Sequence, residues 1–244
     1  MPITCNLSHV LFVDIECVPQ VPSFYDLDDD FKTLREEKGK GLLHMKYWAE
    51  EPAMDELYDT RSGLCPEFGK IIVISAGCFA RTTDGKRQFR VKSFYGDDEK
   101  ALLEWFFELL ESHYTKSSHC LCWHNIKEFD IPYICKRAVI HGLAIPALLD
   151  CQWKKPREVL HLDTLELRRF GSRNGFISLD LLCRVLGVQT PKTDITGKDV
   201  AKAYRVDQQI ERIKEYCERD VLAVAELLLK FMRDGEKIEE VETA

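Results

Sequence analysis

The sequence predicts an α/β fold in which a five-stranded mixed sheet is flanked by helices. The first half of the chain carries three apolar runs, at 10–16, 70–80 and 88–95, that have the length and composition of strands. The second half alternates short strand-like runs with segments whose apolar residues recur at helical spacing. Successive strands followed by alternating helices and strands are typical of a mixed sheet covered by helices.

Local signals bound several of the later elements. Pro132 suits the first turn of a helix, because a missing N–H costs nothing there. Ser178 and Gly187 are a favoured N-cap and a common C-cap, and Asp163 is expected to cap the helix that follows it. Further strands are expected at 119–124 and 159–163, and helices at 97–113, 130–141, 164–170, 178–186, 197–205 and 207–232.

Two segments differ from the alternating pattern. Aromatic and apolar residues are spread among many charges at about 20–66, so we expect a helical insertion between the first two strands. It is either a lid or brace, or a segment that gates substrate or binds a partner. The acidic residues from about 234 are expected to form a flexible tail. We expect residues 1–244 to form one domain.

The composition is that of a globular protein, with 45% hydrophobic and 31% charged residues. The longest apolar runs, near 71–80 and 221–229, are too short to cross a bilayer. We therefore expect a cytoplasmic protein with no membrane partner.

Most of the ten cysteines lie inside apolar patterns, where a free cysteine behaves as a small hydrophobic residue. A disulfide framework is therefore not expected. Zinc binding by His119, Cys120, Cys122 and His124 is disfavoured, because their spacing suits alternate faces of a strand and lacks a second ligand pair.

The net charge of −7 is unevenly distributed. Residues 26–59 hold 11 acidic against 5 basic residues, whereas residues 60–233 hold 28 basic against 23 acidic ones. A mildly basic body is compatible with gripping one nucleic-acid strand at a few phosphates, and not with wrapping a duplex.

Four carboxylates from three separated segments are the strongest functional signal. Asp14 and Glu16 end the apolar run that begins at Val10, and period-2 alternation puts both side chains on one face of the strand. Two acids at the end of a buried strand repel each other and lose hydration, so they need a proton or a cation. Hard divalent cations such as Mg²⁺ and Mn²⁺ prefer such oxygen ligands.

The other two carboxylates lie at helices. Asp130 is at the start of the helix that contains Pro132, where helix capping is the alternative role. Tyr216 and Asp220 are four residues apart in the last helix and therefore share a face. The helix is apolar beyond Asp220, so an acid at that point needs a partner.

Together these motifs resemble those of the DEDD 3′–5′ exonucleases, in the subgroup with a tyrosine in the third motif. Asp14-Ile-Glu16 matches the first motif, Asn125-x-x-x-Phe129-Asp130 the second and Tyr216-x-x-x-Asp220 the third. The chain is most similar to the predicted 3′–5′ exonucleases related to the exonuclease domain of bacterial family-B DNA polymerase. The resemblance covers nearly the whole chain and implies a three-layer, ribonuclease H-like fold.

The resemblance also implies a reaction, the hydrolysis of single-stranded nucleic acid from its 3′ end to nucleoside monophosphates. Two divalent ions, Mg²⁺ or Mn²⁺, would be held by Asp14, Glu16, Asp130 and Asp220, with Asp14 between them. Tyr216 would orient the attacking water, because a phenol with an ordinary pKa near 10 positions better than it accepts a proton.

The resemblance also implies residues that contact the substrate. Asn125 and Phe129 resemble residues that contact the 3′-terminal nucleotides by hydrogen bonding and stacking, and main chain near Ile15 is a further candidate. Lys192 is a weaker candidate for a phosphate contact. The chain departs from the family pattern at 126–128, where Ile-Lys-Glu replaces a small or glycine-containing loop.

Three other functions remain open at this stage. A nucleic-acid or protein-binding module without turnover is disfavoured, since an acidic cluster repels phosphate unless metal is bound. A different ribonuclease H-like enzyme would also use carboxylates and two metals, but the Tyr-x-x-x-Asp spacing favours the exonuclease. DNA is favoured as substrate over RNA, although an exoribonuclease is the alternative. The sequence also leaves open a polymerase or repair partner.

Overall fold

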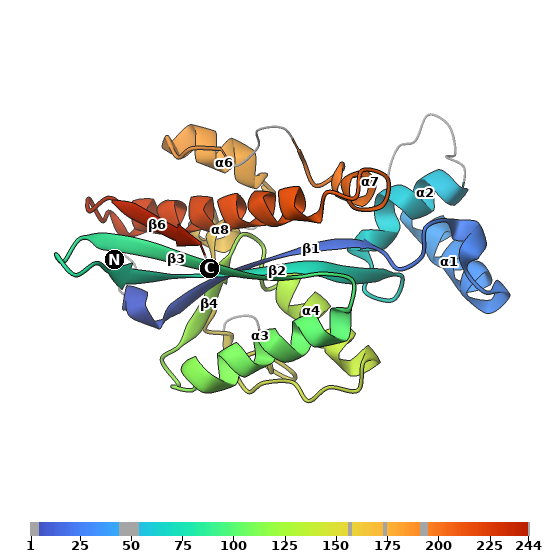
Figure 1. Ribbon diagram of the computed structural model, residues 1–244, viewed down its shortest axis with the longest axis horizontal. Helices are drawn as coiled ribbons and strands as arrows, with labels where there is room; N and C mark the ends of the chain where they lie inside the picture. Colours follow the sequence, from blue (N-terminus) through green and yellow to red (C-terminus); the bar gives the residue numbers. More distant parts are fainter. Residues whose placement is uncertain (1–4, 44–53, 156–157, 173–174, 191–194, 244) are drawn as a thin grey trace.

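A six-stranded mixed sheet forms the central layer of the computed structural model (Figure 1). The structure describes residues 5–43, 54–155, 158–172, 175–190 and 195–243. The strand order is β5-β4-β1-β2-β3-β6. The strands are β1 (Val10–Pro19), β2 (Gly69–Arg81), β3 (Arg87–Tyr95), β4 (Cys120–Trp123), β5 (Leu162–Asp163) and β6 (Glu240–Thr243).

Strand directions confirm the predicted mixed sheet. β1 pairs antiparallel with β2, and β2 pairs antiparallel with β3 through a turn in which Gly85 takes a φ of +85°. That left-handed conformation favours glycine. β4 then pairs parallel with β1, and β5 pairs parallel with β4. Crossover helices join such parallel strands and cover the sheet.

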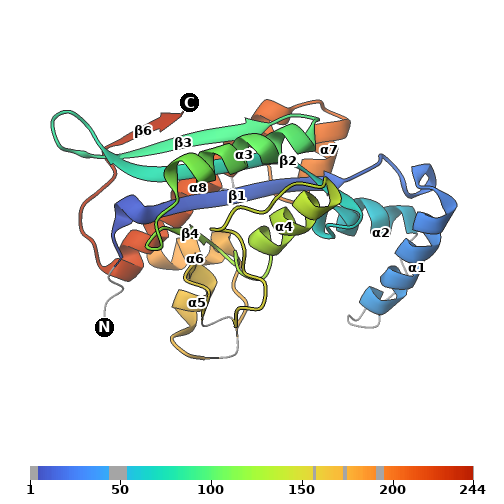
Figure 2. The same cartoon turned by 90° about the horizontal axis from the view of Figure 1, so that it is seen from below.

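Helices pack on both faces of the sheet, which gives three layers. In Figures 1 and 2, α3 and α4 cover one face, while α6, α7 and α8 lie on the other. α8 contacts β1, β2 and β3. The helices of these two layers are α3 (Glu99–His113), α4 (Asp130–Ile140), α5 (Thr164–Arg169), α6 (Leu179–Leu186), α7 (Val200–Arg205) and α8 (Ile210–Met232).

These helices confirm the sequence predictions, with short shifts at their ends. Ser178 caps α6 by accepting from the N–H of Leu181, and Gly187 ends that helix with a φ of +66°. Asp163 caps α5 by accepting from the N–H of Leu165. The last predicted strand is shorter than expected, because only Leu162–Asp163 pairs with β4.

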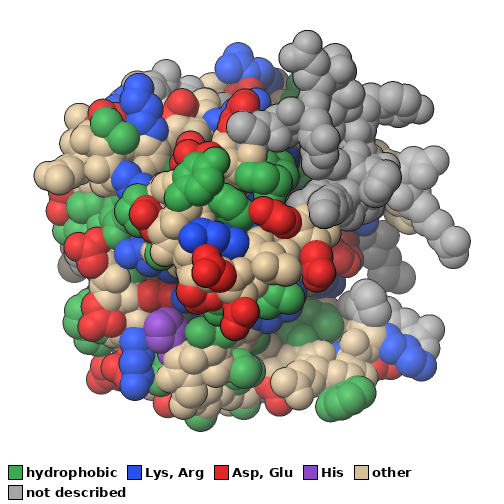
Figure 3. Space-filling model, turned by 90° about the vertical axis from the view of Figure 1, so that its right-hand side faces the viewer, with side chains coloured by type: hydrophobic (Ala, Val, Ile, Leu, Met, Phe, Trp, Pro, Cys, Tyr) green, Lys and Arg blue, Asp and Glu red, His purple; other side chains and the backbone are tan. Residues whose placement is uncertain are grey.

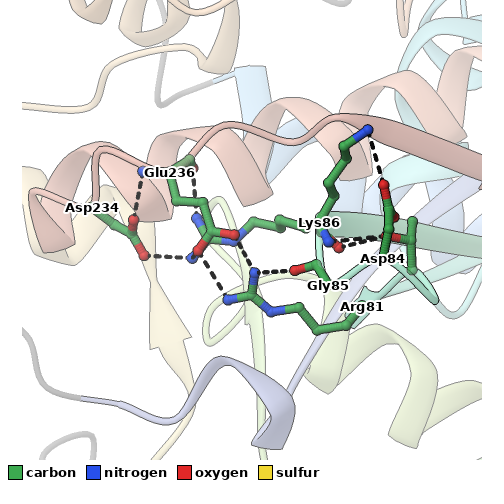
Figure 4. Close-up of polar contacts among 8 residues, drawn as sticks. Arg81, Asp84, Gly85, Lys86, Asp234 and Glu236 are labelled. Atoms are coloured by element: carbon green, nitrogen blue, oxygen red, sulfur yellow. Dashed lines mark hydrogen bonds and ion pairs between the residues drawn. The ribbon is translucent and has the colours of Figure 1, made fainter.

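The acidic tail contains a sixth strand that the sequence prediction omitted. β6 pairs parallel with β3 at the edge of the sheet, where a flexible tail was expected. Ion pairs before this strand are the cause: Arg81 pairs with Glu236 (Figure 4), and Arg87 pairs with both Asp234 and Glu236. Arg87 donates to Oδ2 of Asp234 at 2.8 Å and to the main-chain oxygen of Glu236 at 2.6 Å. Ion pairing therefore directs the chain onto the sheet edge before β6 begins.

The insertion is helical in the part that the structure describes. It contains α1 (Asp29–Leu43) and α2 (Met54–Arg61), which lie beyond one end of the sheet (Figure 1). The buried Arg35 joins these helices by donating to the Ser62 hydroxyl at 2.8 Å and to the Leu57 main-chain oxygen at 3.2 Å.

The end of the molecule that carries the insertion has a mixed surface. Figure 3 shows acidic, basic and hydrophobic side chains interspersed on the described part of this end. No helix among the described residues is both long enough and apolar enough to cross a membrane.

The tail contacts predict that Arg87 stabilises the fold more than its neighbour Arg90. Arg87 is largely buried beside Asp234, whereas Arg90 and its partner Glu242 are both about half exposed. Arg87→Gln should lower the free energy of unfolding by about 1–2 kcal/mol, because hydrogen bonds to charged groups are lost. Arg90→Gln should have little effect, since exposed pairs contribute little. Urea denaturation measures both, and equal effects would contradict the role given to Arg87.

Candidate metal centre

Asp14 and Glu16 lie on the part of β1 that extends beyond the end of β4. β4 pairs with β1 only from Val10 to Phe12, so the following residues of β1 extend past the end of β4. Asp14 and Glu16 lie in this extension, on the same face of the strand as predicted. A carboxylate oxygen from each and the thiol sulfur of Cys217 all lie within 4.8 Å of one another.

Asp130 reaches this place from the turn that follows β4. Asn125 turns the chain after β4 with a φ of +73°, and its main-chain oxygen accepts from the N–H groups of Glu128 and Phe129. The N-cap of α4 is Phe129, without a side-chain cap, and Asp130 is the first helical residue. Oδ2 of Asp130 is buried and has no hydrogen-bond partner. Asp130 is therefore not an ordinary helix cap.

α8 supplies the remaining two side chains. Tyr216 and Asp220 are one turn apart, both are 6% exposed, and the phenol hydrogen-bonds the carboxylate. Their helix packs against β1, and the charges of both Asp14 and Glu16 act on Tyr216. The structure thus brings together the five predicted catalytic residues from three elements.

The electrostatics of the cluster are unfavourable when all its acids are ionised. Burial, and then the charges of Glu16, Asp220 and Asp130, raises the pKa of Asp14 well above its ordinary range. Burial raises the pKa of Glu16 and of Asp130 in the same way, with Asp220 the next cause for Glu16. Desolvated like charges disfavour the ionised form. The cluster therefore takes up protons unless a cation neutralises it.

The donor set fits hard divalent cations. Four carboxylates offer only oxygen ligands, which Mg²⁺ and Mn²⁺ prefer, and the unpartnered Oδ2 of Asp130 is free to coordinate one. Burial, and then the charge of Asp14, raises the pKa of Cys217, so its thiol stays protonated. A neutral thiol does not change the preference of the site for hard ions.

Tyr216 is suited to donating a hydrogen bond. Burial, and then the charge of Asp220, raises the pKa of its phenol. A phenol of this kind stays protonated at neutral pH. It can therefore orient a polar group but cannot act as a general base.

Three of the predicted substrate-contact residues lie in the described part of the chain, close to the cluster in sequence. Asn125 is partly exposed at its turn, while Phe129 is partly buried and packs on Tyr133 with ring centroids 5.5 Å apart. The side chain of Ile15 is buried in the core, so only its main chain remains a candidate. Lys192 lies outside the described residues.

The segment at 126–128 and the disfavoured zinc site also have clear local structures. Lys127 extends to α5, where its ammonium pairs with Glu166 at 2.7 Å. His124 uses both ring nitrogens within the protein, at 2.9 Å from the Thr164 hydroxyl and 2.8 Å from the Ile177 main-chain oxygen. His124 is thus already engaged in hydrogen bonds that hold the turn after β4.

Two contributions to the site were missed at the sequence level. Asp163 does more than cap α5, because its Oδ1 also accepts from the N–H of Asn125 at 2.9 Å and so fixes the turn before Asp130. Cys217 lies against Asp14, with Sγ 3.3 Å from Oδ2. The helical spacing shows that Cys217 lies inward, but no local signal indicates which strand residue it meets.

Comparison with solved structures supports the fold. A family B DNA polymerase from the hyperthermophilic archaeon Pyrobaculum calidifontis matches with a TM-score of 0.52 and 16% identity. The match covers 90% of this chain and 24% of the polymerase, so the chain spans about a quarter of the polymerase's length. No curated protein matches the sequence.

Comparison with family models identifies the family. Residues 64–243 match the model described as a predicted 3′–5′ exonuclease related to the exonuclease domain of PolB. The matched residues include Asp130, Tyr216 and Asp220, while Asp14 and Glu16 lie before them and join the cluster in space. The match extends over more than half of the sequence, and the chain therefore belongs to the family of predicted 3′–5′ exonucleases related to the exonuclease domain of PolB.

Proposed function

We propose that this chain is a metal-dependent 3′–5′ exonuclease that releases nucleoside monophosphates from single-stranded nucleic acid, with DNA favoured. The observation that carries the proposal is the convergence of four buried carboxylates and one phenol from β1, α4 and α8. Such a cluster repels phosphate until cations bind to it. It is therefore suited to phosphodiester hydrolysis with bound metal, and not to binding nucleic acid alone.

The chain's own residues have distinct roles in this proposal. Two bound divalent cations, Mg²⁺ or Mn²⁺, would supply a hydroxide nucleophile near neutral pH and stabilise the departing 3′ oxygen. Asp14 would contribute to both cation sites, with Glu16 and Asp220 at one and Asp130 at the other. The protonated hydroxyl of Tyr216 would orient the attacking water.

The substrate end would be held beside the turn after β4. Asn125 and Phe129 precede Asp130 on that turn, where they would hydrogen-bond and stack on the terminal nucleotides. Main chain near Ile15 would distinguish the sugar, since a 2′-OH is what separates RNA from DNA. Lys192 stays a candidate phosphate contact. The cytoplasmic location and a polymerase or repair partner also stay predictions.

A nuclease assay tests the proposal directly. 5′-labelled single-stranded DNA and RNA of matched sequence are incubated with Mg²⁺, with Mn²⁺ or with EDTA. We expect a metal-dependent ladder that shortens from the 3′ end, stronger for DNA, and no ladder from Asp14→Ala. Glu108→Ala, which changes an exposed acid of α3, should cleave like the wild type. Uncut substrate in every condition would favour the binding module, and preferential cleavage of RNA would favour the exoribonuclease.

Tyr216→Phe tests the positioning of water. Loss of the hydroxyl should slow single-turnover hydrolysis about 10- to 100-fold, as expected for a group that assists proton transfer or orients its partner. Thermal unfolding should change little, because the ring remains. The matched control is Tyr204→Phe, whose hydroxyl contacts Lys70 and Asp97 away from the carboxylates. Wild-type rates in Tyr216→Phe would remove the hydroxyl from the mechanism.

The raised pKa values predict that the metal-free protein loses stability as pH rises. A carboxyl whose pKa is higher in the folded state binds its proton more tightly there, so stability falls between the ordinary carboxyl pKa and the raised one. In EDTA, the Tm should be lower at about pH 8 than at about pH 5. Asp14→Asn should raise the Tm at about pH 8 by about 2–5 °C.

Magnesium should reverse this effect in the wild type. A cation that binds only the folded state stabilises it by mass action. Addition of Mg²⁺ at about pH 8 should therefore raise the wild-type Tm more than that of Asp14→Asn. Calorimetry provides the measurement, and a wild-type Tm that rises with pH in EDTA would contradict the electrostatic account.

A further inference from the structure

A row of polar side chains crosses the face of the sheet that carries Asp14. Asp14 is the cross-strand partner of Ser75, and Ser75 is the cross-strand partner of Ser93. Directly paired residues lie on the same face of a sheet, so the three side chains form a line from β1 to β3. Ser75 is fully buried. A buried hydroxyl is unfavourable unless it is hydrogen-bonded, so these side chains need hydrogen-bond partners.

α8 supplies those partners. The hydroxyls of Ser75 and Ser93 are 2.8 Å apart, and Ser93 donates to Oε1 of Glu218 at 2.7 Å. Next to Glu218 in the chain, Cys217 contacts both the Ser75 hydroxyl and the carboxylate of Asp14. The contacts form a continuous chain from Glu218 through the two serines and the thiol to Asp14.

The contact of Cys217 with Asp14 is directional. Sγ lies 3.3 Å from Oδ2 of Asp14 and 3.6 Å from its main-chain oxygen. Cys217 is fully buried, so packing alone is the alternative explanation. Packing does not require that the sulfur lie within hydrogen-bonding distance of a carboxylate oxygen, whereas an S–H donor does. A carboxylate acceptor also strengthens such a bond relative to a neutral one.

We propose that Cys217 is a positioning residue for the metal centre, whose thiol donates to Oδ2 of Asp14 and fixes the orientation of that carboxylate. The inference rests on the proposed function, because it concerns the ligand that both cation sites would share. With one oxygen held, the carboxylate cannot rotate freely, and its remaining lone pairs keep one direction. Ser75 contacts the thiol from β2 and limits its movement. Such outer contacts orient metal ligands and tune their affinity.

Mn²⁺ binding by calorimetry, without nucleic acid, tests the inference. Cys217→Ala should raise the Kd for Mn²⁺ about 3- to 10-fold, less than is usual for an outer contact because a thiol is a weak donor. Cys217→Ser keeps a donor and should bind within about 2-fold of the wild type. An unchanged Kd in Cys217→Ala would overturn the inference. A Kd in Cys217→Ser as weak as in Cys217→Ala would also overturn it, since the donor would then be irrelevant.

A second buried cysteine separates positioning from packing. Cys122→Ala removes the thiol of a fully buried residue in β4 and should leave the Kd for Mn²⁺ within about 2-fold of the wild type. If Cys122→Ala weakened Mn²⁺ binding as much as Cys217→Ala, loss of packing would explain both and the inference would fail. A wild type that binds no Mn²⁺ would overturn the proposed metal centre itself. Wild-type binding with an unaffected Cys217→Ala would overturn only the positioning role.

Discussion

Mutual repulsion among four buried carboxylates is the constraint on which the rest of the structure depends. None of Asp14, Glu16, Asp130 and Asp220 is more than 9% exposed, so water screens their charges poorly. The metal-free fold must offset this repulsion elsewhere. The apolar packing of α8 is the clearest source, because Val221, Val224 and Leu228 are fully buried beyond Asp220. Apolar packing next to the site thus offsets the repulsion among its carboxylates.

The fold places the acids together near the point where β4 ends and α4 begins. β4 ends at Trp123, α4 begins at Asp130 after the turn at Asn125, and β1 continues past the last residue that pairs with β4. Because β4 ends before these residues of β1, Asp130 at the start of α4 lies near Asp14 and Glu16 on β1. Because β1, α4 and α8 each supply ligands, the site exists only when both helical layers are packed on the sheet. Ligands on such elements are held more rigidly than ligands on loops.

The sequence predicted the features that depend on spacing within one element. Asp14 and Glu16 share a face because a strand alternates, and Tyr216 and Asp220 share one because they are a helical turn apart. What it could not predict depends on partners distant in the chain. Local sequence predicts a flexible acidic tail, because its partners Arg81 and Arg87 are about 150 residues away in the chain. The contact of Cys217 with Asp14 spans 203 residues and leaves no local pattern.

The repulsion among the four carboxylates also helps to distinguish an exonuclease from a module that only binds nucleic acid or protein. A module without turnover would keep four acids whose repulsion weakens the metal-free fold, although amides of nearly the same shape would remove the repulsion. It would also keep a protonated phenol beside Asp220, in a position useful for orienting a small polar group. In the proposed function, cation binding would give each of these features a role: the charge would be neutralised, the unpartnered oxygen of Asp130 would have a cation to bind, and the phenol beside Asp220 would orient a water. These features therefore favour the proposed metal-dependent active site over a remnant on a binding surface.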